Sequence, residues 1–349
     1  MEDKILIIGG YGAVGRIISK KLSALYPSSV IIAGRNIEKA SRLSSQLSNG
    51  TAPRRLDICD WKEEDVPQGV RLVIMCIDVP SMDFVEYCIS KGIQYMDITP
   101  TTEITQRIEK LDSLAKANQV SVVLSVGIAP GISNLLAQHA HNKRPDLQNI
   151  DIYILFGLGE KHGDAGYRWV FENMIDRYPL ASREKDETIS TLSLPKKTQL
   201  LDKRTFYSFN FADQHALLQT TNAQQVITRL AFDSRVSTRL LYLLHRMHLL
   251  KPLVKRIQKL MSKMEKYGQI GSDVYAIKAV AWSGDESYEC SVIGNKEVDL
   301  TAYVAIEVAK IVCKQPLLPG VSHINEVIKN IPAFFADLKK YDEGVKFNL

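Results

Sequence analysis

The sequence predicts an α/β fold with two lobes: a doubly wound parallel sheet comes first, and a second α+β lobe with a mixed, mostly antiparallel sheet follows. Up to about residue 130, short apolar runs alternate with amphipathic helical segments, which is typical of a parallel sheet covered on both faces. Beyond Gly127 the apolar runs become longer and partly alternating, and two of them flank Ser283–Glu286, a hairpin signal. A length of 349 residues suits two lobes.

Each predicted strand and helix of the first lobe is a separate apolar or amphipathic run. The strands are Ile5–Ile8, Val30–Ala33, Arg54–Asp57, Leu72–Ile77, Tyr95–Ile98 and Val120–Val126. The helices are Val14–Leu25, Ile37–Leu47, Met82–Lys91 and Thr105–Asn118. The strands of the second lobe are Ile150–Leu158, Phe206–Phe211, Val226–Phe232, Val274–Trp282 and Tyr288–Ile293, and Leu300–Lys314 is a helix.

Composition limits the class of protein. Hydrophobic residues make up 45% of the chain and charged residues 24%, which favours a folded core over disorder. A net charge of +5 is too mild to indicate a nucleic-acid partner. The five cysteines are scattered and include no CxxC pair, so we predict neither a disulfide framework nor a metal site. The N-terminus does not resemble a secretory signal and no apolar run is long enough to span a bilayer, so we expect a cytoplasmic protein.

A glycine-rich loop follows the first predicted strand and precedes the first helix. Its residues are Gly10, Tyr11, Gly12, Ala13, Val14 and Gly15, in the pattern GxGxxG. In a Rossmann unit the first glycine permits the tight turn, the second leaves room for a pyrophosphate, and the third lets helix and strand approach closely. We therefore predict that this loop binds a dinucleotide at the helix N-terminus. An ordinary glycine turn is the alternative.

The end of the second strand indicates which dinucleotide is bound. An NAD site usually has an acidic residue here for the ribose hydroxyls, but this chain has Arg35 and Asn36, with Lys39 one turn later. A guanidinium binds phosphate through two hydrogen bonds. We therefore predict NADP(H), with Arg35 on the 2′-phosphate. The alternative is that Arg35 is only a solvated residue after a strand.

Loops at the carboxyl ends of the other strands should line the same cofactor crevice. Asp57 follows the third strand and is expected near the adenine. Asp78 and Pro80 follow the fourth strand and are expected near the nicotinamide, as is Gly127 after the sixth. Asp97–Pro100 occupies the same position after the fifth strand. Turn formation is the alternative role for these residues, because aspartate and proline are common in turns.

Several segments, taken in their order along the chain, resemble the saccharopine dehydrogenase-like NADP-dependent oxidoreductases. The matching segments are IIGGYGAVG, AGRN, KGIQYMDIT and LSVGIAPGISNLLA, with a weaker match through DVYAIKAVAW and the C-terminal helix. The resemblance implies a Rossmann lobe, an inserted substrate lobe and a C-terminal return. It also implies reversible hydride transfer at a carbon bonded to an amine nitrogen, with an amino-acid-like substrate. The chain is shorter than typical saccharopine-forming members of the family.

With this resemblance the domain boundaries are predicted as follows. Residues 1–131 form the NADP-binding Rossmann domain, and residues 132–299 form an α+β domain for substrate binding and dimerisation. Residues 300–349 return to the nucleotide domain as C-terminal helices.

The second lobe offers one stretch rich in chemistry. Glycines flank the run from Glu160 to Asp164, which is predicted to be a loop between a strand and a helix. His162 titrates near neutral pH and is the candidate proton donor. Arg168 is the candidate anchor for a substrate carboxylate, and Asp78 is the third candidate catalytic residue. A polar surface loop with a helix cap is the alternative.

A basic segment, residues 235–266, has no counterpart in the family pattern. It contains nine Lys or Arg residues and one acid, Glu265, interleaved with leucines. We favour a helical insertion whose leucine face packs on the second domain or on a dimer mate. Contact with a membrane surface, a partner helix, and a substrate-covering element are the other interpretations.

These observations lead to one main functional prediction and one rival. The main prediction is an NADP(H)-dependent oxidoreductase that acts on a small imine, amine or keto substrate, as a homodimer without nucleic acid. The rival is a non-catalytic NADP-binding module that contacts a membrane or a protein partner through the basic segment. A short-chain dehydrogenase is discounted, because the Tyr87–Lys91 pair lies on an early helix without a partnered serine.

Overall fold

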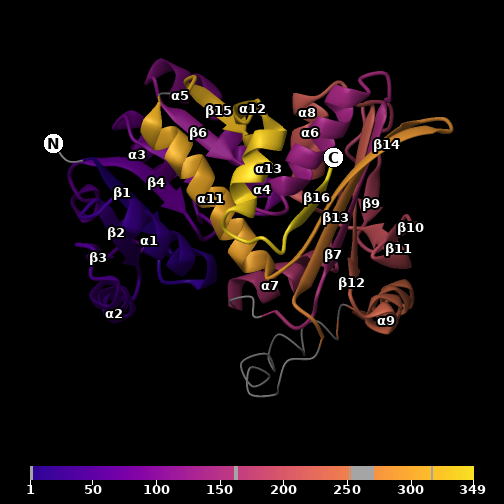
Figure 1. Ribbon diagram of the computed structural model, residues 1–349, viewed down its shortest axis with the longest axis horizontal. Coiled ribbons are helices and arrows are strands. Elements are labelled where there is room, and N and C mark those ends of the chain that lie inside the picture. The colour runs from indigo at the N-terminus through magenta and orange to yellow at the C-terminus, as the bar shows by residue number, and fades with distance from the viewer. Residues whose placement is uncertain (1–2, 161–163, 251, 253–270, 316) are drawn as a thin grey trace. The chain divides into compact units, whose positions relative to one another are not determined.

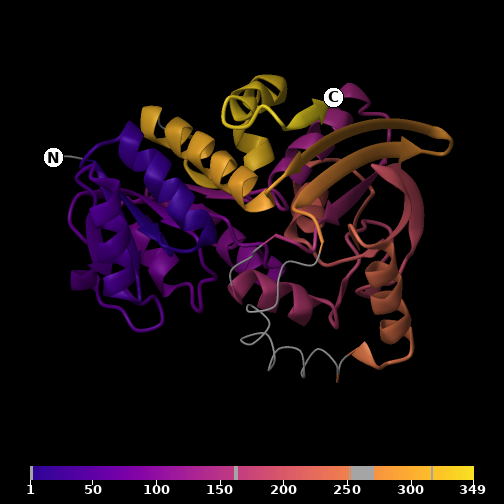
Figure 2. The same ribbon diagram turned by 60° about the horizontal axis from the view of Figure 1, so that its bottom comes forward.

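The computed structural model describes the whole chain except residues 1–2, 161–163, 251, 253–270 and 316. The chain divides into two compact units, drawn in Figures 1 and 2. Unit 1 comprises Met1–Gly131 and Val298–Asn330, and unit 2 comprises Ile132–Glu297 and Ile331–Leu349. Each unit is therefore built from two separate stretches of chain.

Unit 1 has a seven-stranded sheet in the order β15-β6-β5-β4-β1-β2-β3, and all of its strand pairs are parallel. The five interior strands, from β6 to β2, are almost wholly buried, which is why most of them appear in the sequence as continuous apolar runs. The strands are β1 (Lys4–Ile8), β2 (Val30–Gly34), β3 (Ala52–Arg55), β4 (Val70–Met75), β5 (Gln94–Asp97), β6 (Ser121–Leu124) and β15 (Gly320–His323).

Helices cover both faces of this sheet. They are α1 (Ala13–Leu25), α2 (Ile37–Leu47), α3 (Asp83–Ser90), α4 (Thr102–Glu109), α5 (Asp112–Ala117), α11 (Glu297–Lys314) and α12 (Ile324–Val327). Figure 2 shows α11 beside α1 on one face. On the other face, Phe84 of α3 and Ile108 of α4 join a core cluster with Leu6, Val73 and Tyr95 of the strands. This is the predicted doubly wound architecture, with the carboxyl ends of its strands at one edge.

Unit 2 has its own seven-stranded sheet, in the order β10-β11-β12-β7-β13-β14-β16. The β12–β7 pair is parallel, and the other neighbouring pairs are antiparallel. The strands are β7 (Asn149–Phe156), β10 (Lys196–Leu200), β11 (Asp202–Ser208), β12 (Gln225–Phe232), β13 (Val274–Ser283), β14 (Glu286–Asn295) and β16 (Lys346–Asn348). The predicted hairpin is confirmed as β13–β14, turning at Gly284.

Within its described residues, unit 2 also has five helices and a small hairpin. The helices are α6 (Ile132–Lys143), α7 (Asp164–Asn173), α8 (Ala212–Thr220), α9 (Arg235–Arg246) and α13 (Ile331–Lys339), and the hairpin is β8 (Arg177–Pro179) with β9 (Thr188–Ser190). An α/β fold with a parallel sheet followed by a mixed, mostly antiparallel sheet is therefore confirmed. No helix in the described ranges is long and apolar enough to cross a membrane.

Two expectations differ from the structure. Residues 300–349 do not return to unit 1 as a block, because β16 pairs with β14 and carries α13 with it into unit 2. The leucine face of the basic segment was predicted to pack on the second domain or on a dimer mate. Leu240 and Leu243 of α9 are 53% and 42% exposed, so these two side chains do not pack on the second domain, and contact with a dimer mate stays a prediction. The rest of that segment, from residue 253 onward, lies outside the described residues.

Candidate functional site

The connection from β1 into α1 is packed so tightly that Gly10 in the loop and Gly15 in the first turn of α1 have no room for a side chain. A Cβ on Gly10 would lie 2.9 Å from the Ile7 carbonyl oxygen, and one on Gly15 would lie 2.8 Å from the Gly10 Cα. Gly12 differs, because a Cβ there would meet only the Gly9 carbonyl oxygen, at 3.1 Å. Gly10 and Gly15 therefore serve packing, whereas Gly12 is exposed and keeps the loop surface open to a pyrophosphate.

The N-terminus of α1 has the form of an anion site. Its N-cap is Gly12, no described side chain accepts a hydrogen bond from the first turn, and that turn contains no acidic residue. The N–H groups of such a turn and the helix dipole favour a negative charge. Ala13 and Val14, the first residues of the helix, present this end. The arrangement fits the pyrophosphate of a dinucleotide.

The end of β2 is held against the same loop. Tyr11 lies over Gly34, where a Cβ would be 2.6 Å from the Tyr11 ring, and the Tyr11 hydroxyl accepts a hydrogen bond from the Asn36 N–H at 3.0 Å. The Asn36 Oδ1 in turn accepts from the Lys39 N–H at 2.9 Å and caps α2. Arg35 is exposed and forms no hydrogen bond or ion pair with another described residue. Its guanidinium is therefore available to a phosphate group.

Asp57 has a local role after β3. Its Oδ1 accepts a hydrogen bond from the Cys59 N–H at 3.1 Å, which forms an Asx turn. The turn chemistry weighed as an alternative is thus present, and a contact between Asp57 and adenine remains a prediction.

Two aspartates at the ends of β4 and β5 are joined through Thr99, whose hydroxyl donates to Asp78 and whose N–H donates to Asp97. The hydroxyls of Thr99 and Thr101 donate to the Asp78 carboxylate at 2.5 and 3.1 Å. The Thr99 N–H and the Tyr95 hydroxyl both donate to Asp97 at 2.7 Å. Burial raises the pKa of Asp97 to about 7, against the lowering effect of these two hydrogen bonds. A buried carboxyl that holds a proton near neutral pH is therefore linked to the exposed Asp78.

A histidine, His323 of β15, holds the loop after β6 in place through a hydrogen bond. The Ser125 hydroxyl lies 2.8 Å from Nδ1 of His323, and Nε2 of the same ring lies 3.1 Å from Oε1 of Glu109. Ser125 has a positive φ of 61°, and the loop beyond it is so compact that a Cβ on Gly131 would overlap the carbonyl oxygen of Gly127. The buried Gly127 therefore belongs to a loop that is rigidly held at the carboxyl end of β6.

Two of the predicted residues, His162 and Arg168, are less fully described, and a third, Pro80, lies at the surface. His162 lies outside the described residues. Arg168 is a residue of helix α7, and the described part of the structure does not include its side chain. Pro80 is exposed in the loop after β4, close in sequence to Asp78. Among the described residues, no group of three or more His, Cys, Asp or Glu side chains is arranged to hold a metal ion.

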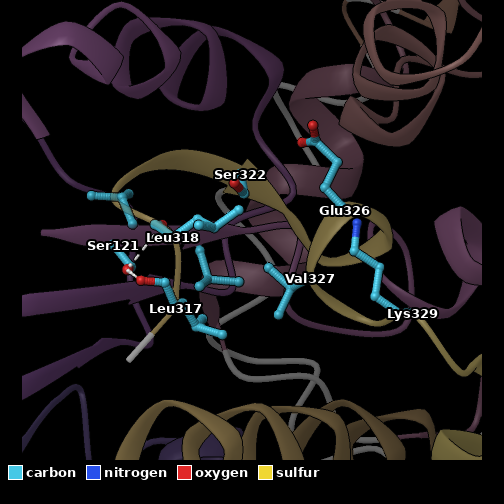
Figure 3. A pocket seen from close by; sticks show the side chains of 9 residues that line it. Ser121, Leu317, Leu318, Ser322, Glu326, Val327 and Lys329 are labelled. Carbon is cyan, nitrogen blue, oxygen red and sulfur yellow. Dashed lines mark hydrogen bonds between the residues drawn. The ribbon is translucent and has the colours of Figure 1, made fainter. Parts of the chain in front are cut away.

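A cavity in unit 1 lies apart from these residues. It has a volume of about 220 Å³ and lies beside β6, β15 and α12 (Figure 3). Its wall includes Ser121, whose hydroxyl donates to the carbonyl oxygens of Leu317 and Leu318 at 3.1 Å. None of the predicted cofactor-binding residues lines this cavity.

Comparisons with known proteins agree with the unit 1 site. Residues 5–123 match the model of a family described as the saccharopine dehydrogenase NADP binding domain. This match confirms the predicted resemblance and the predicted cofactor, NADP(H). A comparison with curated protein sequences gave no significant match.

Two solved structures have the fold of the whole chain. An apo saccharopine dehydrogenase (L-Glu forming) from Saccharomyces cerevisiae is 15% identical, with a TM-score of 0.65, over 99% of this chain and 100% of that one. A C. glutamicum DAP dehydrogenase in complex with DAP is 14% identical, with a TM-score of 0.50, over 98% and 99% of the two chains. At these identities the comparison establishes the shared fold of the two-lobed chain.

Two groups near the site were not predicted. Asp97 lay within a loop expected at the crevice, but its burial and its partner Tyr95, two residues earlier on the same strand, single it out only in the structure. His323 is 198 residues from Ser125 in sequence. No local pattern indicates that contact, because it depends on β15 pairing with β6.

Proposed function

We propose that this chain, whose residues 5–123 match the model of the saccharopine dehydrogenase NADP binding domain, is an NADP(H)-dependent oxidoreductase. The bound nicotinamide supplies or accepts the hydride. The protein's part is to bind and orient the cofactor and to move one proton at the substrate nitrogen or oxygen.

One observation carries the cofactor-binding part of this proposal: an uncapped helix N-terminus and an exposed arginine lie at the ends of adjacent strands. Gly12 begins α1 after β1, and Arg35 follows β2, which pairs with β1 in parallel. Tyr11 connects the two, because it packs on Gly34 and accepts from the Asn36 N–H. The pyrophosphate would bind at Gly12 and the 2′-phosphate at Arg35.

The substrate proposed is a small amino-acid-like imine, amine or keto compound, as the family resemblance implies. His162 is the proposed proton donor and Arg168 the proposed anchor for a carboxylate. Asp78 is the third proposed catalytic residue, and its hydrogen bonds from Thr99 and Thr101 fix its carboxylate after β4. A homodimer and a cytoplasmic location belong to the same proposal.

The test compares NADPH with NADH in wild type and Arg35→Asp. Oxidation of each cofactor is followed with a panel of 2-keto acids, each combined with an amino acid, and thermal shifts are recorded without substrate. Wild type is expected to turn over NADPH and to gain more stability from NADPH than from NADH. Arg35→Asp should weaken NADPH binding about tenfold or more and reverse the preference, because one carboxylate repels the phosphate and accepts from the ribose hydroxyls.

Arg107→Asp is the matched control, since it makes the same charge change at an exposed position on α4. It should leave the cofactor preference unchanged. Equal stabilisation of wild type by NADH and NADPH would contradict the phosphate assignment. NADPH binding without turnover across the whole panel would contradict the proposed enzyme activity and favour a binding module.

A further inference from the structure

Helix α9 exposes a row of apolar side chains, Val236, Leu240, Leu243 and Met247, hereafter the α9 apolar row. They are spaced four, three and four residues apart, so they share one face of the helix. Their exposed fractions are 78%, 53%, 42% and 56%, whereas Thr238 on the opposite face is buried. Figure 2 shows α9 at the margin of unit 2. A contiguous exposed apolar patch marks an interaction surface.

Positive charge accompanies the α9 apolar row. Arg235, Arg239 and Arg246 are exposed alongside it, and the sequence from 235 to 250 contains no acidic residue. Asp202 of β11 pairs with Arg235 at 2.7 Å. Neither Arg239 nor Arg246 forms an ion pair with a described carboxylate. The partner that covers this helix must therefore accept apolar contact and supply negative charge.

An open pocket lies between α9 and the chain that leads into β10. It has a volume of about 490 Å³. Arg246 contributes its positive charge, His245 and His248 contribute imidazole rings, and Ser190 and Ser193 contribute hydroxyls. Burial and the neighbouring His248 lower the pKa of His245, which favours its neutral form. The rest of the wall is apolar or aromatic: Leu192, Leu194, Pro195 and Tyr242. A guanidinium and hydroxyls on an apolar wall suit an anionic headgroup attached to hydrocarbon.

From these features we propose that α9 binds the surface of an anionic phospholipid bilayer. The helix lies in the plane of the interface, with the α9 apolar row among the outer acyl carbons. Arg239 and Arg246 face the lipid phosphates. A second copy of this chain suits the row less well, since two α9 helices face to face would bring together the arginines of both copies with no acid on either helix.

The full-length chain is tested by co-sedimentation with vesicles of phosphatidylcholine alone and of phosphatidylcholine with about 30% phosphatidylserine. We expect binding to the anionic vesicles, weakened by high salt. Arg239→Gln with Arg246→Gln should weaken this binding about 20-fold, and Leu240→Ser with Leu243→Ser should weaken it at least about tenfold. Since these side chains are exposed, both double variants should retain the wild-type melting temperature.

Matched controls separate the surface from general charge and hydrophobicity. Arg107→Gln with Lys110→Gln removes two exposed charges from α4, and Leu25→Ser with Leu318→Ser removes two leucines that are 50% and 87% exposed. Both controls should bind anionic vesicles like wild type.

Two results would overturn the proposal. One is a chain that stays in the supernatant with anionic vesicles. The other is a Leu240→Ser, Leu243→Ser variant that binds vesicles normally but sediments as a smaller species, which would mean that a second copy covers the row. Because the readout is vesicle binding, neither result depends on whether the chain oxidises NADPH.

Discussion

Gly12, the N-cap of α1, and Gly15, in the first turn of the same helix, lack a side chain for different reasons. At Gly15 a Cβ would meet backbone atoms of Gly9 and Gly10, which cannot move without displacing the end of β1. At Gly12 the only neighbour would be the Gly9 carbonyl oxygen at 3.1 Å, and the residue is exposed. The lack of a side chain at Gly15 is required by the packing of the fold. At Gly12 it leaves space for a molecule that approaches the loop from the solvent.

This difference predicts opposite behaviour for two alanine variants. Gly15→Ala should lower the free energy of unfolding by about 2 kcal/mol or more, because the new methyl group overlaps backbone. Gly12→Ala should change the unfolding free energy by less than about 1 kcal/mol but weaken NADPH binding about tenfold. Urea unfolding and NADPH titration of both variants provide the measurements. A Gly12→Ala chain that binds NADPH like wild type would remove the pyrophosphate from this loop.

At the scale of elements, the two helices after β1 and β2 end differently at their N-termini. Helix α1 has glycine at its N-cap, which leaves its first N–H groups without a side-chain acceptor in the described residues. Helix α2 has Asn36 at its N-cap, and the Asn36 side chain accepts from the Lys39 N–H. Thus a side chain of α2's own sequence accepts a hydrogen bond from its first turn, whereas the first N–H groups of α1 are left open to a ligand.

The cap on α2 leads to a prediction about Asn36, which the sequence placed among the cofactor-binding residues. Asn36→Ala should lower the free energy of unfolding by about 1 kcal/mol through the lost cap. If capping is its main role, the dissociation constant for NADPH should stay within about threefold of wild type. Chemical unfolding and NADPH titration measure the two effects. A large loss of NADPH affinity without loss of stability would assign Asn36 to the cofactor instead.

The elements that the sequence predicts well are those with a strong apolar pattern. The buried strands β1, β2 and β4 and the hairpin β13–β14 lie within a few residues of their predicted ranges. The missed strands are short, polar or both, as in KKTQL of β10, GVSH of β15 and KFN of β16. Strands β15 and β16 form because a strand that is distant in sequence offers hydrogen bonds, which the local sequence does not indicate. Strand β10 pairs with the adjacent β11, and it was missed because its residues are mostly polar.

The site follows the same rule. The glycine loop and Arg35 could be predicted because each has a fixed spacing from an apolar strand. The environment of Asp97 could not, since its burial depends on β4, β5 and β6 lying side by side. The contact between His323 and Ser125 depends on a strand pairing across most of the chain. The sequence pattern predicts which residues lie near a site, but the tertiary packing of the chain determines which of them form hydrogen bonds with one another.

At the scale of the whole molecule, each unit buries one carboxyl with a raised pKa. Burial raises the pKa of Asp97 in unit 1 to about 7 and that of Asp213 in unit 2 to about 6. The Thr228 hydroxyl donates to Asp213 at 2.7 Å, which offsets part of this burial. The folded chain therefore holds protons that an unfolded chain releases near pH 4.

These two carboxyls predict that stability falls as the pH rises from about 4 to about 7. The folded state binds more protons than the unfolded state in this range, so each carboxyl lowers the unfolding free energy by at most about 1.4 kcal/mol per pH unit. When urea unfolding is measured across this pH range, the free energy of unfolding of Asp97→Asn should decrease less with rising pH than that of wild type. Asp146→Asn is the control: the Asp146 pKa is lowered to about 2 by Arg144, so the fall should be unchanged. An unchanged fall in Asp97→Asn would contradict the protonated state of Asp97.

The discontinuous units also determine how the protein can be divided. The seventh strand of the nucleotide-binding sheet, β15, joins β6 from nearly 200 residues later in the chain, and β16, at the C-terminus, joins β14 after unit 1 has intervened in the sequence. A fragment ending at residue 131 would leave β6 as a bare edge with unpaired N–H and C=O groups, open to pairing with another copy. The NADP-binding unit is therefore best isolated by joining residues 1–131 to residues 298–330, which removes both stretches of unit 2, residues 132–297 and 331–349.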